Sequence, residues 1–75
     1  MQPCASLYLR RHISEKNVDF LKSYLDNFGH AGASVEHWRK EVILHLHDRR
    51  DVIAIRSQFP ELVDAWVDHE RGGGQ

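Results

Sequence analysis

Residues 34–50 read SVEHWRKEVILHLHDRR, and the fold that the sequence predicts depends on this stretch. Ser34 is a residue type favoured at helix N-caps. After it, apolar residues recur at the three- and four-residue spacing of one helical face, namely Val35, Trp38, Val42 and Leu46. At about 100° per residue, Ile43 falls to one side of that stripe and Leu44 almost opposite it. We therefore predict a helix over residues 34–50 that is apolar on more than one side.

A helix of this kind has a consequence in a chain of 75 residues. A chain this short buries only about 60% of the surface of its unfolded state, so one small core rarely covers two apolar faces. We expect part of this surface to contact another protein chain. The predicted partner-binding residues are Ile43 and Leu44, with the basic pair Arg49 and Arg50 setting the orientation.

Further helices are predicted on both sides of this stretch. Ser14 suits the N-cap of a helix that ends at Gly29, because glycine readily adopts the left-handed conformation of a C-cap. Asp51 suits the N-cap of a later helix. Pro60 ends that helix and begins the last one, since proline fits the first turn of a helix and not its interior.

The fold class follows from these elements. Residues 6–12 fit either a short helix or an extended arm, because the spacing of their apolar residues is compatible with both a helix and a strand. We predict an all-α fold, a compact bundle of four to five short helices. It forms a single helical domain over residues 1–71, followed by a flexible glycine-rich tail at 72–75.

Composition excludes several classes of protein. The formal net charge of -1 argues against electrostatic attraction to nucleic acid or to an anionic membrane. No apolar run approaches the roughly 20 residues of a membrane span, and the first residues do not resemble a secretory signal. Cys4 is the single cysteine, which indicates a reducing compartment and a cytoplasmic location.

Charge is unevenly distributed along the chain. Residues 1–50 contain eight Lys or Arg and six Asp or Glu, whereas residues 51–75 contain two against five. Two interpretations are open: the acidic last helix attracts the pair Arg10-Arg11 or the pair Arg49-Arg50, within one subunit or between subunits, or it is a solvated acidic face.

The six histidines raise the question of a metal site. On a helix, His37, Glu41 and His45 would lie four residues apart on one side, and Asp48 is close to them; imidazole and carboxylate suit zinc. Chance spacing on a polar helix face explains the pattern better, so we predict no metal and no cofactor. No nucleophile elbow, phosphate loop or paired carboxylates occur, so we predict no catalytic residues, no enzymatic activity and no small-molecule substrate.

A helix-turn-helix regulator of nucleic acid is an alternative. The short glycine-containing connection before residue 34 would join two helices, with Arg39 and Lys40 near the start of the second one. Glu36 and Glu41 flank these bases and the basic footprint is missing, so nucleic acid is the less favoured partner.

Short amphipathic helices that include RRDVI at 49–53 and FPEL at 59–62 loosely resemble those of death-fold and effector-associated adaptor domains. The resemblance covers the last half of the chain and implies homotypic assembly. A small phage- or plasmid-encoded inhibitor fits a short helical chain equally well. The predicted function is a small protein-interaction module or regulator that acts by helix-face docking and self-associates, with a dimer favoured.

Overall fold

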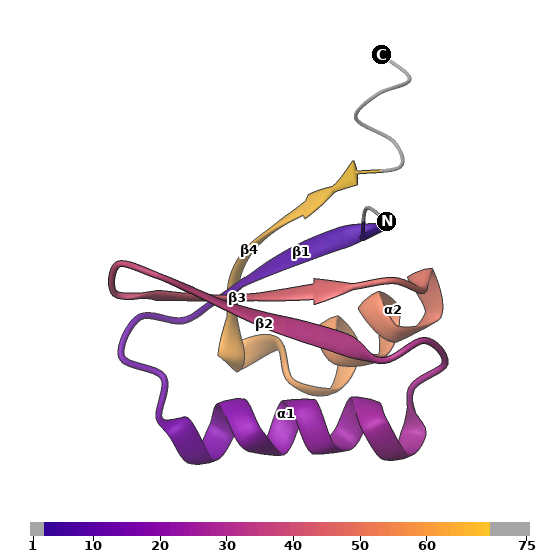
Figure 1. Ribbon diagram of the computed structural model, residues 1–75, viewed down its shortest axis with the longest axis horizontal. Coiled ribbons are helices and arrows are strands. Elements are labelled where there is room, and N and C mark those ends of the chain that lie inside the picture. The colour runs from indigo at the N-terminus through magenta and orange to yellow at the C-terminus, as the bar shows by residue number, and fades with distance from the viewer. Residues whose placement is uncertain (1–2, 70–75) are drawn as a thin grey trace.

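Strands and helices alternate along the chain, in the order βαββαβ. The computed structural model describes residues 3–69. Its elements are strand β1 (Ala5–Leu9), helix α1 (Glu15–Phe28), strands β2 (Ala33–Trp38) and β3 (Glu41–Leu46), helix α2 (Arg49–Gln58), a short 3₁₀ turn η1 (Pro60–Leu62) and strand β4 (Val63–Asp68). The strands form one antiparallel sheet in the order β2-β3-β1-β4 (Figure 1). This is the split βαβ, or ferredoxin-like, topology. The all-α prediction is wrong.

The all-α prediction fails mainly at residues 34–50, where it placed a helix. They form the β2–β3 hairpin and the start of α2, with the chain reversing at Arg39-Lys40 between the paired residues Trp38 and Glu41. Leu44 and Leu46 are fully buried, whereas Ile43, which precedes Leu44, lies on the opposite side of the strand. The apolar residues on two sides, which predicted a helix with surplus surface, belong to a strand with both faces partly covered.

The prediction of a last helix beginning at Pro60 is also wrong, because Val63–Asp68 form strand β4. Pro60 acts as predicted: it stops α2 and occupies the first turn of η1. The chain then extends along β1, where Leu7 pairs with Trp66. Of the two predictions for residues 6–12, the extended one is closer, since β1 is a central strand. The tail predicted at 72–75 lies outside the described residues.

Helix α1 confirms its predicted boundaries. The Ser14 side chain accepts a hydrogen bond from the Asn17 N–H, and the helix ends before Gly29. The predicted left-handed cap is wrong, because Gly29 has φ -79°. Glycine is needed there for space: a Cβ atom would collide with the Leu25 carbonyl oxygen and lie 3.1 Å from a carboxylate oxygen of Asp51.

The predicted cap of α2 needs a similar correction. Asp48 is the N-cap residue, and its side chain accepts from the Arg50 N–H. Asp51 lies in the first turn and is buried, 2% exposed. Both of its carboxylate oxygens lie 3.0 Å from the His30 N–H, and one lies 3.4 Å from the Ala31 N–H. The carboxylate of α2 therefore anchors the loop between α1 and β2.

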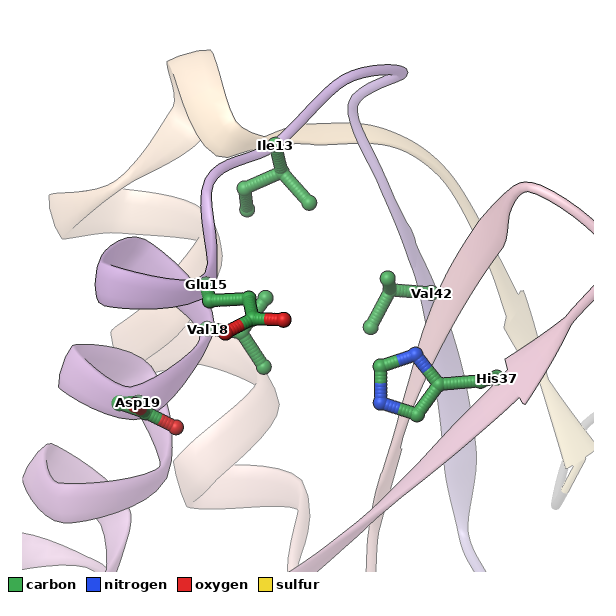
Figure 2. A pocket seen from close by; sticks show the side chains of 6 residues that line it. All are labelled: Ile13, Glu15, Val18, Asp19, His37 and Val42. Carbon is green, nitrogen blue, oxygen red and sulfur yellow. The ribbon is translucent and has the colours of Figure 1, made fainter.

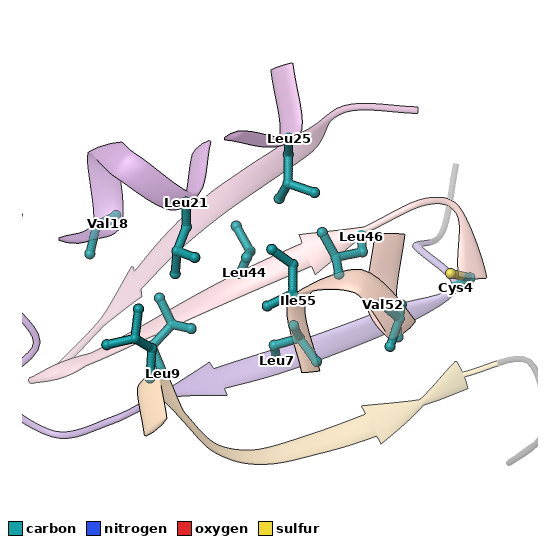
Figure 3. Packing of buried hydrophobic residues seen from close by; sticks show 12 residues of the cluster. Cys4, Leu7, Leu9, Val18, Leu21, Leu25, Leu44, Leu46, Val52 and Ile55 are labelled. Atoms are coloured by element: carbon teal, nitrogen blue, oxygen red, sulfur yellow. The ribbon is translucent and has the colours of Figure 1, made fainter. Parts of the chain in front are cut away.

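Both helices cover the same face of the sheet. Their buried residues meet the alternate strand residues that point toward them (Figure 3); the labelled members of this core are Cys4, Leu7, Leu9, Val18, Leu21, Leu25, Leu44, Leu46, Val52 and Ile55. The cluster takes residues from four segments that are distant in sequence, as expected for a domain built from two layers. Within residues 3–69, no helix is long and apolar enough to cross a bilayer.

Candidate functional site

The side of the sheet that faces away from the helices has no helix on it within residues 3–69. We call it the open face. Residues paired across neighbouring strands share a face, so the register assigns its members: Ser6, Tyr8, Ser34, Glu36, Trp38, Glu41, Ile43, His45, Ala65 and Val67. Trp38 is 53% exposed and Val67 44% exposed, while Ile43 is 7% exposed. The open face is therefore a mixed polar and apolar surface.

The four predicted partner-binding residues do not form one surface. Ile43 lies on the open face, whereas Leu44 lies on the helix side and is fully buried. Leu44 is therefore not available to a partner. The guanidinium of Arg49 lies 3.1 Å from the Asp68 carboxylate, which is a contact between the basic pair and the acidic C-terminal part of the kind expected. It joins α2 to a strand, and not to a helix.

Arg50 pairs locally with the cap residue of its own helix. Its side chain donates to both Asp48 oxygens at 3.1 and 2.8 Å. The side-chain hydrogen bond, with a further bond from the Arg50 N–H, lowers the pKa of Asp48 from 3.8 to about 2. The same contact raises the pKa of Arg50. Since Arg50 completes a helix cap, its role is local.

A row of four polar side chains crosses the open face. The Glu36 carboxylate lies 2.7 Å from His45 Nε2, His45 Nδ1 lies 2.8 Å from Ser6 Oγ, and Ser6 Oγ lies 2.8 Å from His69 Nε2. The carboxylate can only accept, so His45 donates to it from Nε2, and the Ser6 hydroxyl bonds to both His45 Nδ1 and His69 Nε2.

This row resembles a charge-relay arrangement in composition only. Ser6 is 3% exposed, so its oxygen is not accessible to a substrate. Strand β1 pairs with both β3 and β4, which occupies the backbone N–H groups that would otherwise stabilise an oxyanion. The row instead ties three strands together: β2, β3 and β1.

The predicted metal ligands are separated by the sheet. His37 faces the helices, whereas Glu41 and His45 lie on the open face. Among residues 3–69, no group of three or more His, Cys, Asp or Glu side chains is placed to hold a metal ion.

His37 lines a pocket between α1 and the hairpin. The pocket measures about 310 Å³ and has an apolar wall made by Ile13, Val18 and Val42. Figure 2 shows the His37 ring and the Glu15 carboxylate pointing toward one another across it, with Asp19 one turn further along the helix. Two carboxylates make this pocket acidic.

A second pocket lies at the end of the hairpin and has the opposite charge. It is lined by five residues that we call the basic tip: Arg11, Trp38, Arg39, Lys40 and Glu41. Arg11 comes from the connection between β1 and α1, and the other four form the β2–β3 turn. This pocket has no signal in the sequence, because Arg11 is distant from residues 38–41 in the chain and no typical turn residue occurs at 39–40.

The remaining candidate is the free edge of β2. Strand β2 is the first in the sheet order and pairs along its full length with β3, without a bulge. Within residues 3–69, no strand lies on its other side. Such an edge presents unpaired N–H and C=O groups to solvent.

Comparison of the chain with family models, curated proteins and solved structures finds no match. The alternative of a helix-turn-helix lacks its recognition helix, since those residues form the β2–β3 hairpin. The helices that carried the resemblance to death-fold domains are reduced to α2 and η1. Function must therefore be argued from the surfaces described above.

Proposed function

We propose that this protein is a small protein-interaction module that self-associates by pairing β2 with β2 of a second copy. The free edge of β2 is the observation that carries the proposal. Main-chain pairing at a sheet edge is a common mode of protein recognition. This mechanism replaces docking through a helix over residues 34–50, because these residues form the β2–β3 hairpin and the start of α2.

The two edges of the sheet differ in how well they are protected. Strand β4 has an irregular register opposite Tyr8 and Leu9, follows a proline turn, and bears Asp64 and Asp68. Bulges, prolines and charges are the devices by which proteins block edge pairing. Strand β2 has neither proline nor bulge over its six residues. The edge formed by β2 is therefore the more available of the two.

The turn indicates which residues of β2 offer their backbone groups. A two-residue loop closes with a hydrogen-bonded pair, here Trp38 and Glu41. Hydrogen-bonded pairs alternate along an antiparallel ladder, so Glu36 and Ser34 also bond to β3. The N–H and C=O groups of the residues between them point outward. Val35, at the centre of the strand, is the main one.

Charge selects the register of the pairing. With Val35 opposite Val35 of the second copy, Glu36 faces Ser34 and His37 faces Ala33, so no like charges are opposed. Shifting the register by one step toward the hairpin turn places Glu36 opposite Glu36 of the second copy, which is unfavourable. A two-fold axis through Val35 therefore gives the better complementarity.

The test is the solution mass by light scattering after size exclusion, from about 1 µM to about 1 mM. A short edge-to-edge interface is small, so we expect a dimer with a dissociation constant of about 1–100 µM. Val35→Pro removes an outward N–H and leaves the β2–β3 ladder intact, and it should yield a monomer with an unchanged circular dichroism spectrum. Val35→Thr keeps the N–H and the branched shape, and it should still dimerise. A monomeric wild type, or a Val35→Pro variant that dimerises like the wild type, would refute the proposal.

We also propose a cytoplasmic location. The supporting observation is that Cys4 is the single cysteine and is buried, so the fold does not depend on a disulfide within the chain, as is usual for proteins of reducing compartments. Alkylation of the thiol in freshly lysed cells, after unfolding, would test this: a blocked thiol would contradict it.

A further inference from the structure

The basic tip combines a cavity with an excess of positive charge. The cavity measures about 430 Å³, within the range of small-molecule sites. Its charged residues are Arg11, Arg39, Lys40 and Glu41, which give three positive charges and one negative charge. The local balance is therefore +2 in a chain whose formal net charge is -1.

The three cations of the tip lack a counter-ion in the described structure. The ion pairs among residues 3–69 involve Arg49, Arg50 and His45, and none involves Arg11, Arg39 or Lys40. Cations that line one cavity repel one another, and an anion bound between them offsets this repulsion. The charge of the tip therefore favours an anionic ligand.

Trp38 adds a flat aromatic surface to the same cavity. Its side chain is 53% exposed. The Arg39 guanidinium lies 4.6 Å from the centre of the indole, over one face of the ring. This cation–π contact supports the indole from one side, and the 53% exposure of the side chain leaves part of it accessible to a ligand. Aromatic faces of this kind stack on nucleobases, with a gain of about 1–3 kcal/mol per base.

We propose that the basic tip binds a mononucleotide, with its base stacked on Trp38 and its phosphate held by Arg11 and Lys40. The excess of two positive charges matches a phosphate dianion. The indole and the size of the cavity favour the whole nucleotide over free phosphate. The single exposed indole and the overall negative charge favour one nucleotide over a polymer. The proposal does not depend on self-association, because Val35 is not part of the tip.

The experiment follows Trp38 fluorescence in a Trp66→Phe variant, which leaves one indole in the chain. Titration with adenosine 5′-monophosphate should quench the emission saturably. Adenosine alone and inorganic phosphate alone should each bind at least about tenfold more weakly, because each supplies one half of the contacts. Absence of saturable quenching up to about 10 mM nucleotide would overturn the proposal. So would equal affinity for phosphate alone, or saturable binding of a single-stranded RNA oligonucleotide without binding of the mononucleotide.

A matched pair of variants tests the position of the site. Arg11→Gln removes a cation that lines the cavity, and we expect affinity for the nucleotide to fall at least about fivefold. Arg10→Gln removes the neighbouring cation, which does not line the cavity, and should leave affinity within about twofold. Equal losses in the two variants would show general electrostatic attraction and contradict a built site. Circular dichroism of each variant checks that the fold is retained.

Discussion

Asp51 offers the strongest test of how this fold is held together. It is 2% exposed, and its carboxylate accepts from the N–H groups of His30 and Ala31, the first residues after the helix C-cap Gly29. Asp51→Ala leaves these donors without their partner in a part-buried loop. We expect a large loss of stability from this single substitution.

The size of the loss follows from the contacts. A hydrogen bond to a charged group contributes about 1.5–3 kcal/mol. The His30 bond at 3.0 Å to each oxygen is a full one, whereas the Ala31 bond at 3.4 Å is at the weak end. A carboxylate in the first turn of a helix adds about 0.3–1 kcal/mol through the helix dipole. Since His30 is exposed, water can replace part of the lost hydrogen bonding. We therefore expect Asp51→Ala to lower the free energy of unfolding by about 3 kcal/mol.

Urea and thermal unfolding followed by circular dichroism measure this cost. For a domain of this size, about 3 kcal/mol corresponds to a fall of about 12–24 °C in Tm. It is also a large fraction of a total stability of about 4–11 kcal/mol. Asp51→Asn keeps one acceptor oxygen and should lose about half as much. Asp64→Ala, at an exposed aspartate of β4, should change stability by less than about 0.5 kcal/mol. A loss below about 1 kcal/mol for Asp51→Ala would refute the anchoring role.

Two further predictions concern the cap of α2 and the hairpin turn. The pKa of Asp48 is about 2 against 3.8 without its partners, so its contribution to stability is present above pH 3.8 and is lost as the pH falls through about 2. Carboxyl NMR titration should show this value, and Arg50→Gln should raise it toward 3.8; an unchanged pKa in that variant would exclude Arg50 as the cause. Arg39 has φ 59°, so Arg39→Gly should be more stable than Arg39→Ala by about 1 kcal/mol in urea unfolding, since both lose the same side chain and only glycine is unstrained there. The opposite order would contradict a left-handed turn.

The elements that the sequence predicts correctly are those whose signals are local. Helix α1 has a capping serine, a 3.6-residue apolar repeat that buries Val18, Leu21 and Leu25, and a terminal glycine. Pro60 likewise ends α2, because proline has no backbone N–H and its ring cannot be accommodated in the interior of a helix. These features depend on residues a few positions apart, so no knowledge of the tertiary structure is needed to predict them.

The hairpin was mispredicted because its turn lacks the usual turn residues. Arg39 and Lys40 replace the Asn-Gly or Gly-containing pair that marks a two-residue loop. Without that signal, the apolar residues before and after the turn show the spacing of a single helical face. The residues of β3 also satisfy a period of two, with Leu44 and Leu46 inward and Ile43 outward, and their β-branched neighbours favour a strand. Only pairing with β1, from the other end of the chain, decides between the two periods.

The candidate sites were beyond prediction for the same reason. The free edge of β2 exists only once the sheet order is known, and the basic tip requires Arg11 to meet a turn that the sequence hides. Ile43 was correctly expected to lie off the main core stripe, yet its neighbour Leu44 was assigned to the surface. On a helix these two residues point 100° apart, whereas on a strand they point to opposite faces.

The hidden turn and the proposed nucleotide site have one cause in common. A glycine or asparagine at position 39 would adopt the left-handed conformation at little cost, and it would have marked the turn in the sequence. Arginine there costs about 1–2 kcal/mol of backbone strain, which the cation–π contact with Trp38 offsets only in part. In return, the guanidinium lies over the indole beside a cavity that Arg11 and Lys40 also line. Strain that persists in a folded protein is concentrated at ligand sites and turns, and here the two coincide. The residue least favourable to the turn also supplies one of the three cations of the tip, so stability and binding should change in opposite directions when Arg39 is replaced by glycine.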